Sequence, residues 1–456
     1  MLLASKNKHL HIKVGLNMTL SVEEFSSELF AGLNLDHHGR YYVAYSGGVD
    51  STVLLHLMSQ LRDQHGFDLV ALHVSHNLQA ESKAWAEHCG RVCELLKVPL
   101  RQTSLNLTSS DEATARDARY QWFREQVEYR SVIMTAHHQQ DRAETFLFNL
   151  MRGAGSTGLS SLRASRPFFG AKLVRPFLKF SQADIVNYAH QHDLSWIEDP
   201  SNQDQRYSRN EIRHQILPVL QAFRPDAIQS IARAAANLEQ ENGLLREIAI
   251  CDLVDVREHP IHPLDQSHAL CVDDIGHLTP GRQANVLRFW LQSLKLHSPS
   301  RRLLARLLLA ISEPPASTAV LQECGSQFRF YKGYMYVMAA TTARQTFSSV
   351  SWQNLEQPLA LFENKLMIGS TDKLRELVLS HKKSRLRLAA KPEVSNPKAL
   401  QGHSLNLRKW MQDIGVPPWR RQALPLLTMS EAGNDVVIAP VDQQFHSDWV
   451  SVDTPY

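Results

Sequence analysis

The amino-acid sequence predicts an α/β protein whose N-terminal part is built on a parallel sheet. Strand-like apolar runs alternate with amphipathic helical patterns between residues 41 and 151, a helical region follows at 219–311, and short strand-like runs return from 319 onward. Strands that alternate with helices are typical of parallel sheets covered by helices on both faces. We therefore expect an α/β domain at 18–218, a mainly helical middle domain at 219–345 and a small α+β domain at 346–456.

The individual elements follow from hydrophobic periodicity. In the N-terminal domain we expect strands at 41–45, 69–75, 98–104 and 132–136, and helices at 51–64, 82–96, 112–128 and 140–151. The clearest helices of the middle domain are 227–250 and 282–296. Strand-like runs occur at 328–339, 366–369 and 436–440, with a helix near 404–414.

The composition narrows the class of protein. Of the 456 residues, 43% are hydrophobic and 21% are charged, as in ordinary globular proteins. No apolar run approaches the roughly 18 residues needed to span a bilayer, and the N-terminus lacks a secretory-signal pattern, so we expect a soluble cytoplasmic protein without membrane contact. Five cysteines without a CxxC motif argue against a disulfide framework. The net charge is only +3, so nucleic-acid binding would require local basic patches.

The stretch YSGGVDST at 45–52 joins the first predicted strand to the first predicted helix. A glycine turn that leads into a helix presents backbone N–H groups and a helix N-terminus to one point, which suits an anion. The two glycines permit close backbone approach, and Asp50 could hold a metal or cap a backbone amide. A plain glycine turn before a capped helix is the alternative. The Walker pattern GxxxxGK[ST] is absent.

A second polar group follows the strand predicted at 132–136. The stretch TAHHQQDRAET at 135–145 places Asp141 and Glu144 three residues apart at a helix start, so both carboxylates can face one cleft. Two acids that stabilise a helix N-terminus are the alternative. His137 and His138 lie at the strand end, where ligands of such sheets bind, although a core or capping role is equally open for them.

Several stretches together carry a family resemblance. SGGVDS resembles the pyrophosphate loop of the PP-loop ATP pyrophosphatases, which split ATP between its α and β phosphates. In the N-terminal domain, the order and spacing of six stretches are similar to the tRNA(Ile)-lysidine synthase family: ALHVSHNL (71–78), EATARDARY (112–120), TAHHQQDRAET, RGAGSTGLSSL (152–162), VRPFL (174–178) and WIEDPSNQDQRYSRNEIR (196–213). The similarity resumes at LRKWMQDIGVPPWRRQALPLL (407–427), which resembles the C-terminal domain of the longer bacterial form.

The resemblance implies a reaction and its partners. These enzymes are ligases that use ATP to attach free L-lysine to C2 of the wobble cytidine of an isoleucine tRNA with a CAU anticodon. The reaction passes through an adenylated cytidine, releases AMP and pyrophosphate, and changes codon specificity from AUG to AUA and identity from Met to Ile. The expected cofactors are ATP and Mg²⁺, without a prosthetic group. A homodimer is left open.

The resemblance implies site residues, and the basic stretch HKKSRLRLAAK at 381–391 adds Lys382 and Lys383 to them. The expected catalytic residues are Asp50, Arg119, Asp141 and Glu144, and Mg²⁺ is expected at Asp50 and Asp141. The expected ATP site consists of Ser46, Gly47, Gly48, Val49, Asp50, Ser51, His73, His137, Arg152 and Gly153. The expected tRNA or substrate cleft consists of Arg206, Arg209, Asn210, Arg213, Lys382, Lys383, Trp419 and Arg420. Solvated charges, a capping box at Ser208–Glu211 and a packed tryptophan are the alternatives for this last group.

The chain departs from the family at two positions of 135–145. The family pattern is usually HHxDDQAET, whereas here Gln140 replaces the first aspartate and Arg142 replaces the glutamine. We therefore assign no metal role to Gln140, and altered activity is left open. Two rival functions remain: a PP-loop tRNA thiolase, which the absence of CxxC disfavours, and a non-catalytic tRNA-binding protein, which only Gln140 favours.

Overall fold

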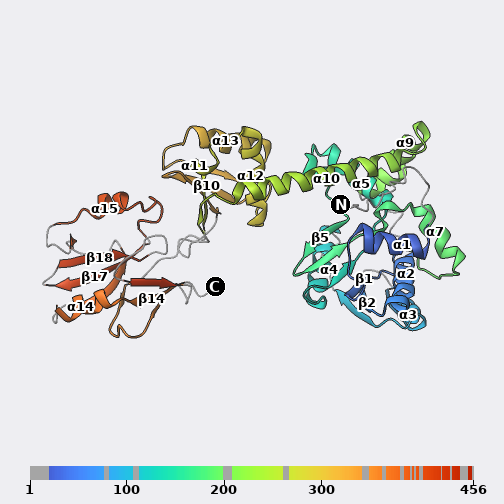
Figure 1. The fold of residues 1–456 in the computed structure, drawn as a ribbon, viewed down its shortest axis with the longest axis horizontal. Coiled ribbons are helices and arrows are strands. Elements are labelled where there is room, and N and C mark those ends of the chain that lie inside the picture. Colours follow the sequence, from blue (N-terminus) through green and yellow to red (C-terminus); the bar gives the residue numbers. More distant parts are fainter. Residues whose placement is uncertain are drawn as a thin grey trace, which may run out of the picture. The chain divides into compact units, whose positions relative to one another are not determined.

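The computed structural model describes most of the chain in several ranges. These are 20–76, 82–105, 112–198, 208–259, 267–340, 349–361, 366–380, 385–390, 393–394, 397–399, 404–422, 424–431, 434–441 and 450–453. The chain forms two compact units, Met1–Leu244 and Leu245–Tyr456, each with its own sheets (Figure 1). Among the described helices, none has the length and apolarity that crossing a bilayer requires.

A six-stranded sheet forms the centre of the first unit, in the order β3-β2-β1-β4-β6-β5. Its strands are β1 (Arg40–Ala44), β2 (Asp68–His76), β3 (Leu100–Leu105), β4 (Val132–Met134), β5 (Ser165–Phe168) and β6 (Ala171–Val174). All neighbouring strands are parallel except β5 and β6, which form an antiparallel pair at the edge. The chain runs from β1 outward to β3 and then crosses to β4, so the strand order reverses between β1 and β4. Ligands of open α/β sheets bind at such a reversal.

Helices cover both faces of this sheet because successive residues of each strand point to opposite sides. Tyr41 and Val43 of β1 share a hydrophobic core with α2 (Val49–His65), α3 (Ser82–Leu95) and α7 (Gln182–Gln191). The same core includes residues of α1 (Val22–Ser27) and of the π-helical turn η1 (Glu28–Gly32). Tyr42, between Tyr41 and Val43, packs against α4 (Glu112–Gln126) on the other face. Figure 1 shows β1 and β2 close to α2 and α3.

The remaining helices of the first unit follow β4. They are α5 (Gln139–Met151), α6 (Ser156–Leu159), the 3₁₀ turn η2 (Pro176–Lys179), α8 (Ser208–Glu211), the π-helical turn η4 (Ile212–Ile216), α9 (Leu217–Phe223) and α10 (Ala227–Leu253). The last of these is a long continuous helix that leads from the first unit into the second (Figure 1).

The second unit contains three antiparallel or mixed sheets. The first has the order β7-β8-β11-β10-β9 and comprises β7 (Glu258–His259), β8 (His268–Cys271), β9 (Leu321–Glu323), β10 (Ser326–Tyr331) and β11 (Tyr334–Ala339). The second has the order β12-β15-β17-β18-β16 and comprises β12 (Val350–Ser351), β15 (Arg385–Ala390), β16 (Lys398–Ala399), β17 (Pro425–Glu431) and β18 (Asn434–Pro440). The third joins β13 (Leu359–Leu361), β14 (Leu366–Ser370) and β19 (Val450–Asp453).

In the described part of the second unit, further helices follow α10 and accompany these sheets. The first sheet shares a hydrophobic core with α11 (Val272–Ile275), α12 (Pro280–Ser293) and α13 (Arg301–Ser312). The other two helices are α14 (Asp372–Ser380) and α15 (Leu407–Asp413). Leu374 of α14 packs in a hydrophobic core with residues of β15, β17 and β18.

The predicted fold class is confirmed, with two additions. All four strands and four helices predicted between 41 and 151 are present within a few residues of their expected bounds. The β5–β6 pair is an addition, because each strand has only four residues and too little alternation to stand out. The middle region contains a sheet of which the sequence predicts only 328–339, since the other strands have two to four residues. The domain limits 18–218, 219–345 and 346–456 stay a prediction.

Candidate active site

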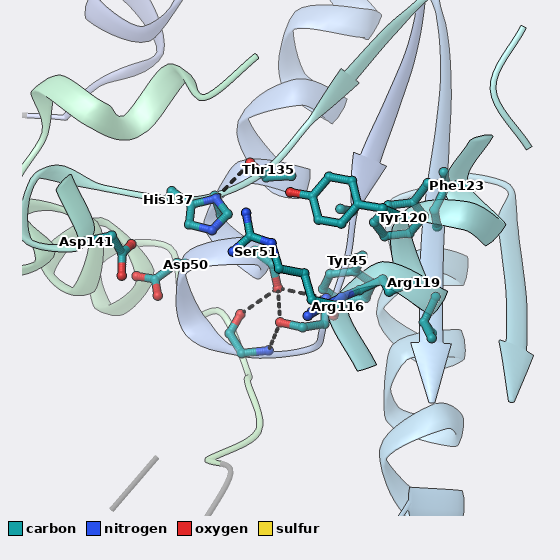
Figure 2. Close-up of a pocket in the computed structure, with 16 residues that line it drawn as sticks. Tyr45, Asp50, Ser51, Arg116, Arg119, Tyr120, Phe123, Thr135, His137 and Asp141 are labelled. Atoms are coloured by element: carbon teal, nitrogen blue, oxygen red, sulfur yellow. Dashed lines mark hydrogen bonds between the residues drawn. The ribbon is translucent and has the colours of Figure 1, made fainter. Parts of the chain in front are cut away.

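A pocket of about 260 Å³ lies at the carboxyl ends of β1, β2 and β4, where the strand order reverses. Three segments supply its polar lining (Figure 2). They are the loop and helix start after β1 (Tyr45, Ser46, Gly48, Asp50 and Ser51), one face of α4 (Arg116, Arg119 and Tyr120), and the segment after β4 (Thr135, His137 and Asp141). Expected nucleotide-binding and catalytic residues from distant parts of the sequence therefore meet in one cavity.

The loop after β1 is held in shape by its own polar groups. The Ser51 hydroxyl donates to the Gly48 carbonyl at 3.0 Å and accepts from the Ser46 N–H at 3.2 Å. The Gly48 N–H donates to Ser46 Oγ at 3.3 Å. Among the described residues, no side chain caps the N-terminus of the 17-residue helix α2, which begins at Val49. Gly48, Asp50 and Ser51 line the pocket, so this uncapped helix start lies at the pocket wall, as an anion site requires.

Gly47 has a backbone conformation and surroundings that favour glycine. Its φ is +88°, and a Cβ there would lie 2.9 Å from Cys89 Sγ and 3.0 Å from Ile197 Cδ1. The Ile197 N–H also donates to the Gly47 carbonyl at 2.9 Å. The loop is thus packed tightly between α3 and the segment near Ile197, so its shape is set before any ligand binds.

We expect Gly47→Ala to lower both stability and ATP affinity. The left-handed backbone costs about 1–2 kcal/mol for a residue with a Cβ, and the contact with Cys89 adds to this cost. Gly66→Ala is a matched control, because Gly66 has a φ of +75° with nothing within 4 Å of the added Cβ. Thermal unfolding and binding of a non-hydrolysable ATP analogue should show that only Gly47→Ala weakens nucleotide binding. Equal, normal nucleotide affinity in both variants would contradict the assignment of the loop.

Asp50 and Asp141 lie next to each other at one end of the pocket, with His138 behind them. Figure 2 shows the two carboxylates adjacent. The Gln140 N–H donates to Nδ1 of His138 at 3.2 Å, so the proton of the neutral ring is on Nε2. That Nε2 lies 3.5 Å from Asp141 Oδ2 and 3.9 Å from Asp50 Oδ2. His138, which the sequence leaves open as a core or capping residue, thus caps α5 and orients the carboxylate pair.

The two carboxyl groups differ in their tendency to ionise. Burial raises the pKa of Asp50, and the neighbouring Asp141 charge adds to the effect. Burial opposes ionisation of Asp141 too, but His138, His137 and Arg213 hold its pKa below the usual range. Asp50 Oδ1 is buried and has no hydrogen-bond partner within the described residues. A cation beside this oxygen would favour the ionised form and satisfy the oxygen, so the site suits a hard metal ion.

Glu144 is engaged by Arg213 rather than exposed in the pocket. Nε and Nη2 of Arg213 donate to the two Glu144 oxygens at 2.6 and 2.9 Å, and Nη2 also reaches Asp141 Oδ1 at 3.3 Å. Glu144 is only 2% exposed. Arg213, expected in a substrate cleft, instead joins η4 to both acids of α5. Gln140 Nε2 donates to Glu144 Oε1 at 3.1 Å, where an aspartate would place a second negative charge beside Glu144.

Arg142, the second departure from the family pattern, forms an ion pair with Glu239 of α10. Arg142 is 5% exposed, and the other Glu239 oxygen accepts from the Ala164 N–H at 3.0 Å. Nearby on α10, Asn242 donates to Ser160 Oγ at 2.9 Å. The arginine at position 142 therefore has an ionic partner in this chain, and the ion pair fixes α5 against the N-terminal half of α10.

We expect Arg142→Gln to destabilise the protein by about 1–3 kcal/mol, since it removes a charged partner from a half-buried carboxylate. Adding Glu239→Gln should recover part of the loss, because the two side chains interact directly. Urea unfolding of the two single variants and the double variant measures the coupling between them. Strictly additive changes would show that the pair contributes nothing to stability.

The other residues expected in the ATP site differ in their position relative to the pocket. His73 is buried behind the pocket, where its Nδ1 donates to the Tyr45 carbonyl at 2.9 Å. Burial lowers the pKa of this ring, so it holds the start of the loop as a neutral group. His137 lines the pocket beside Thr135, with 2.8 Å between its Nδ1 and the threonine Oγ1. Arg152 caps the C-terminus of α5, Gly153 follows it, and neither lines the pocket.

The expected RNA contacts at 419–420 are packed within the second unit. Arg420 is 1% exposed, and its Nη2 donates to Ser267 Oγ at 2.7 Å. The Trp419 ring packs edge-on against Tyr336 with 5.2 Å between the ring centroids. The buried guanidinium has no surface to offer RNA, so these side chains join 419–420 to β11 instead. Arg209 and Asn210 lie in α8, whereas Arg206, Lys382 and Lys383 lie outside the described residues.

Residues that the sequence does not assign to the site complete it; for phosphate contact the sequence favours Arg119 over Arg116. Tyr45, Tyr120 and Arg116 line the pocket together with Arg119. Tyr120 belongs to EATARDARY, but its role depends on where α4 crosses the sheet, which no local pattern shows.

Comparison with known proteins identifies the family. A PP-loop domain model matches residues 18–220, a TilS substrate binding domain model matches 270–336, and a TilS substrate C-terminal domain model matches 385–449. The tRNA(Ile)-lysidine synthase of Yersinia pseudotuberculosis is 32% identical over 92% of this chain and 95% of its own length. The enzyme of the same name from Coxiella burnetii is 33% identical over 87% and 88% of the two chains. That from Pseudomonas aeruginosa is 44% identical over 56% and 59%. The chain belongs to the tRNA(Ile)-lysidine synthase family.

Proposed function

We propose that this protein joins free L-lysine to C2 of the wobble cytidine of an isoleucine tRNA with a CAU anticodon, at the expense of ATP. The observation that carries the proposal is the position of the 46–51 loop, which brings Asp50 beside Asp141 in one pocket at the strand reversal. Family membership supplies the substrates. We place the reaction in the cytoplasm, because tRNA is its substrate.

The chemistry requires two displacements. The cytidine O2 attacks the α-phosphorus of ATP, the bond between that phosphorus and the bridging oxygen to the β-phosphorus breaks, and pyrophosphate leaves. The lysine ε-amine, after losing a proton, then attacks C2 and expels the O2 atom as part of AMP. In the first step, negative charge develops on the leaving pyrophosphate. The N–H groups of the loop and of the start of α2 can stabilise this charge by donating hydrogen bonds.

The carboxylate pair has the properties of a Mg²⁺ site. Asp50 Oδ1 is buried and unsatisfied within the described residues, and the neighbouring Asp141 carries its charge at neutral pH. Mg²⁺ is usually held by one or two carboxylates together with phosphates, so a third protein ligand is not needed. A Mg²⁺ ion bound by Asp50 and Asp141 would neutralise phosphate charge. His138 and Arg213 hold the Asp141 side chain in place.

The two cysteines of the first unit, Cys89 and Cys93, do not suit the chemistry of a thiolase. Burial raises the pKa of Cys89 to about 12 and that of Cys93 to about 12, so neither thiol ionises at neutral pH. Both pack in the core of the first unit beside α2. A reactive sulfur carrier requires an accessible thiolate, which these two residues do not provide.

Analysis of the products separates the candidate functions. With isoleucine tRNA, Mg²⁺ and ATP but no lysine, we expect pyrophosphate release and an adenylated tRNA that retains AMP. Adding lysine should release AMP in a one-to-one ratio with pyrophosphate. A non-catalytic binding protein would release neither product, and a thiolase would need a sulfur donor instead of lysine.

A further inference from the structure

Tyr120 lies at the end of the pocket away from Asp50 and Asp141 (Figure 2). Four arginines lie around it, and two of them, Arg116 and Arg119, line the pocket. Arg116 and Arg119 lie on α4 with Tyr120, Arg166 lies on β5, and Arg175 directly follows β6. The guanidinium carbons of Arg116 and Arg166 lie 5.4 and 5.5 Å from the centroid of the Tyr120 ring. We call these four arginines the arginine cluster. Three separate chain segments thus bring positive charge to one place.

Three members of the arginine cluster, Arg116, Arg166 and Arg175, have little compensating negative charge from the described residues. Within the described part of the chain, no Asp or Glu forms an ion pair with Arg116, Arg166 or Arg175. Arg175 is 3% exposed, and its Nη1 donates to the Arg163 carbonyl at 2.7 Å. Its buried Nε has no hydrogen-bond partner among those residues. Burying a charge without a counter-charge is costly, and a bound anion would remove this cost.

The pKa of Tyr120 indicates a positive electrostatic potential around its hydroxyl group. Burial would raise the pKa of its hydroxyl, but the surrounding charges of Arg175, Arg116, Arg166 and Arg119 lower the pKa below its usual value. Figure 2 shows the hydroxyl directed into the pocket near Thr135. The positive field of the cluster therefore extends into the cavity, where a ligand would meet it.

We propose that the arginine cluster binds a backbone phosphodiester of the RNA next to the cytidine that is modified. The proposal rests on the proposed function, because it assigns the second anion of the pocket to the polynucleotide. The pyrophosphate of ATP already has the 46–51 loop and the start of α2 at the other end. Arginine suits phosphate because its planar fork can donate two parallel hydrogen bonds.

The chemistry of the step explains why such a contact is needed. A base in an RNA loop must leave its stacked neighbours to place O2 against the α-phosphorus, and this costs free energy. Phosphate contacts position a nucleic acid without reading its sequence. A phosphodiester fixed beside the target base would hold the base in the pocket, while other contacts select the tRNA.

Single phosphate neutralisation tests the proposal. Full-length isoleucine tRNAs are assembled by ligation, each with one methylphosphonate linkage in the anticodon loop, and their affinities for wild type and Arg116→Gln are measured. At one linkage flanking the wobble cytidine, we expect the methylphosphonate and the substitution each to weaken binding about tenfold. The two changes together should weaken binding no further. Arg116→Gln should also lower the slope of log K against log salt by about 0.7.

Arg124→Gln is the matched control, because Arg124 lies on the same helix, is exposed and stacks on Phe169 with 4.4 Å from its guanidinium carbon to the ring centroid. It should bind every tRNA as wild type does. Loss of affinity for an ATP analogue in Arg116→Gln, with an unchanged methylphosphonate profile, would overturn the proposal in favour of an ATP phosphate. A wild-type protein that binds no tRNA would overturn the proposed function as well. Normal tRNA binding by Arg116→Gln would overturn the cluster assignment alone.

Discussion

Asp50→Asn should lower the rate of tRNA-dependent pyrophosphate release by about 10²–10³-fold, which is the usual effect of removing one group that stabilises developing charge. The physical reason lies in the pocket, where Asp50 sits at the start of α2 beside Asp141 with its Oδ1 buried and unsatisfied within the described residues. An amide keeps the shape of the side chain but removes the charge that a divalent cation requires. Release of labelled pyrophosphate from ATP measures the effect.

The affinity of Asp50→Asn for tRNA distinguishes a catalytic role from a structural one. We expect tRNA binding and the unfolding midpoint to stay near the wild-type values, because Asp50 forms no hydrogen bond that holds the described loop together. If tRNA binding is lost together with pyrophosphate release, Asp50 supports the fold of the pocket. The carboxylate pair would then not be the site of phosphate chemistry.

Arg213→Gln should destabilise the protein by about 3 kcal/mol, as expected when one partner of a buried ion pair is removed. Glu144 is 2% exposed and receives two hydrogen bonds from Arg213, so the substitution leaves a buried carboxylate with Gln140 as its remaining described donor. Asp141 loses the same guanidinium, so the rate of pyrophosphate release should fall too. Urea unfolding and the pyrophosphate assay measure the two effects.

Two further variants show whether the loss comes from the buried charge. Arg213→Gln combined with Glu144→Gln should be more stable than Arg213→Gln alone, because no unpaired charge remains. Arg224→Gln is the surface control: its pair with Asp226 is solvent-exposed, so the unfolding midpoint should not change. If Arg213→Gln and Arg224→Gln behave alike, the Arg213 contacts have no structural importance.

The sequence predicts that the 45–52 stretch joins a strand to a helix, because its signals are local. Glycines, hydroxyls and Asp50 follow a strand and lead into a helix within eight residues, and strand-helix alternation places that turn at the carboxyl edge of the sheet. Asp141 follows the neighbouring strand β4, so the pairing of β1 with β4 is what brings it to Asp50. General rules of sheet topology do not by themselves specify that β1 pairs with β4.

The remainder of the site depends on partners that are distant in sequence. Arg213 has the residue type of a phosphate ligand, but its nearest acids are Asp141 and Glu144, about seventy positions earlier. Arg142 breaks the family pattern, and only its contact with Glu239 shows that the exchange has a partner. Arg420 stands beside a tryptophan, as many RNA contacts do, yet β11 and Ser267 enclose it. Local patterns cannot distinguish a buried cation from an exposed one.

Incorporation of radiolabelled lysine into tRNA tests the central claim most directly. The protein is incubated with ATP, Mg²⁺ and lysine, together with transcribed isoleucine tRNA bearing a CAU anticodon or, as control, elongator methionine tRNA with the same anticodon. We predict that label enters only the isoleucine tRNA and that it is found on the wobble nucleotide after nuclease digestion. Absence of label from the isoleucine tRNA, in protein that binds ATP and that tRNA, would contradict the account.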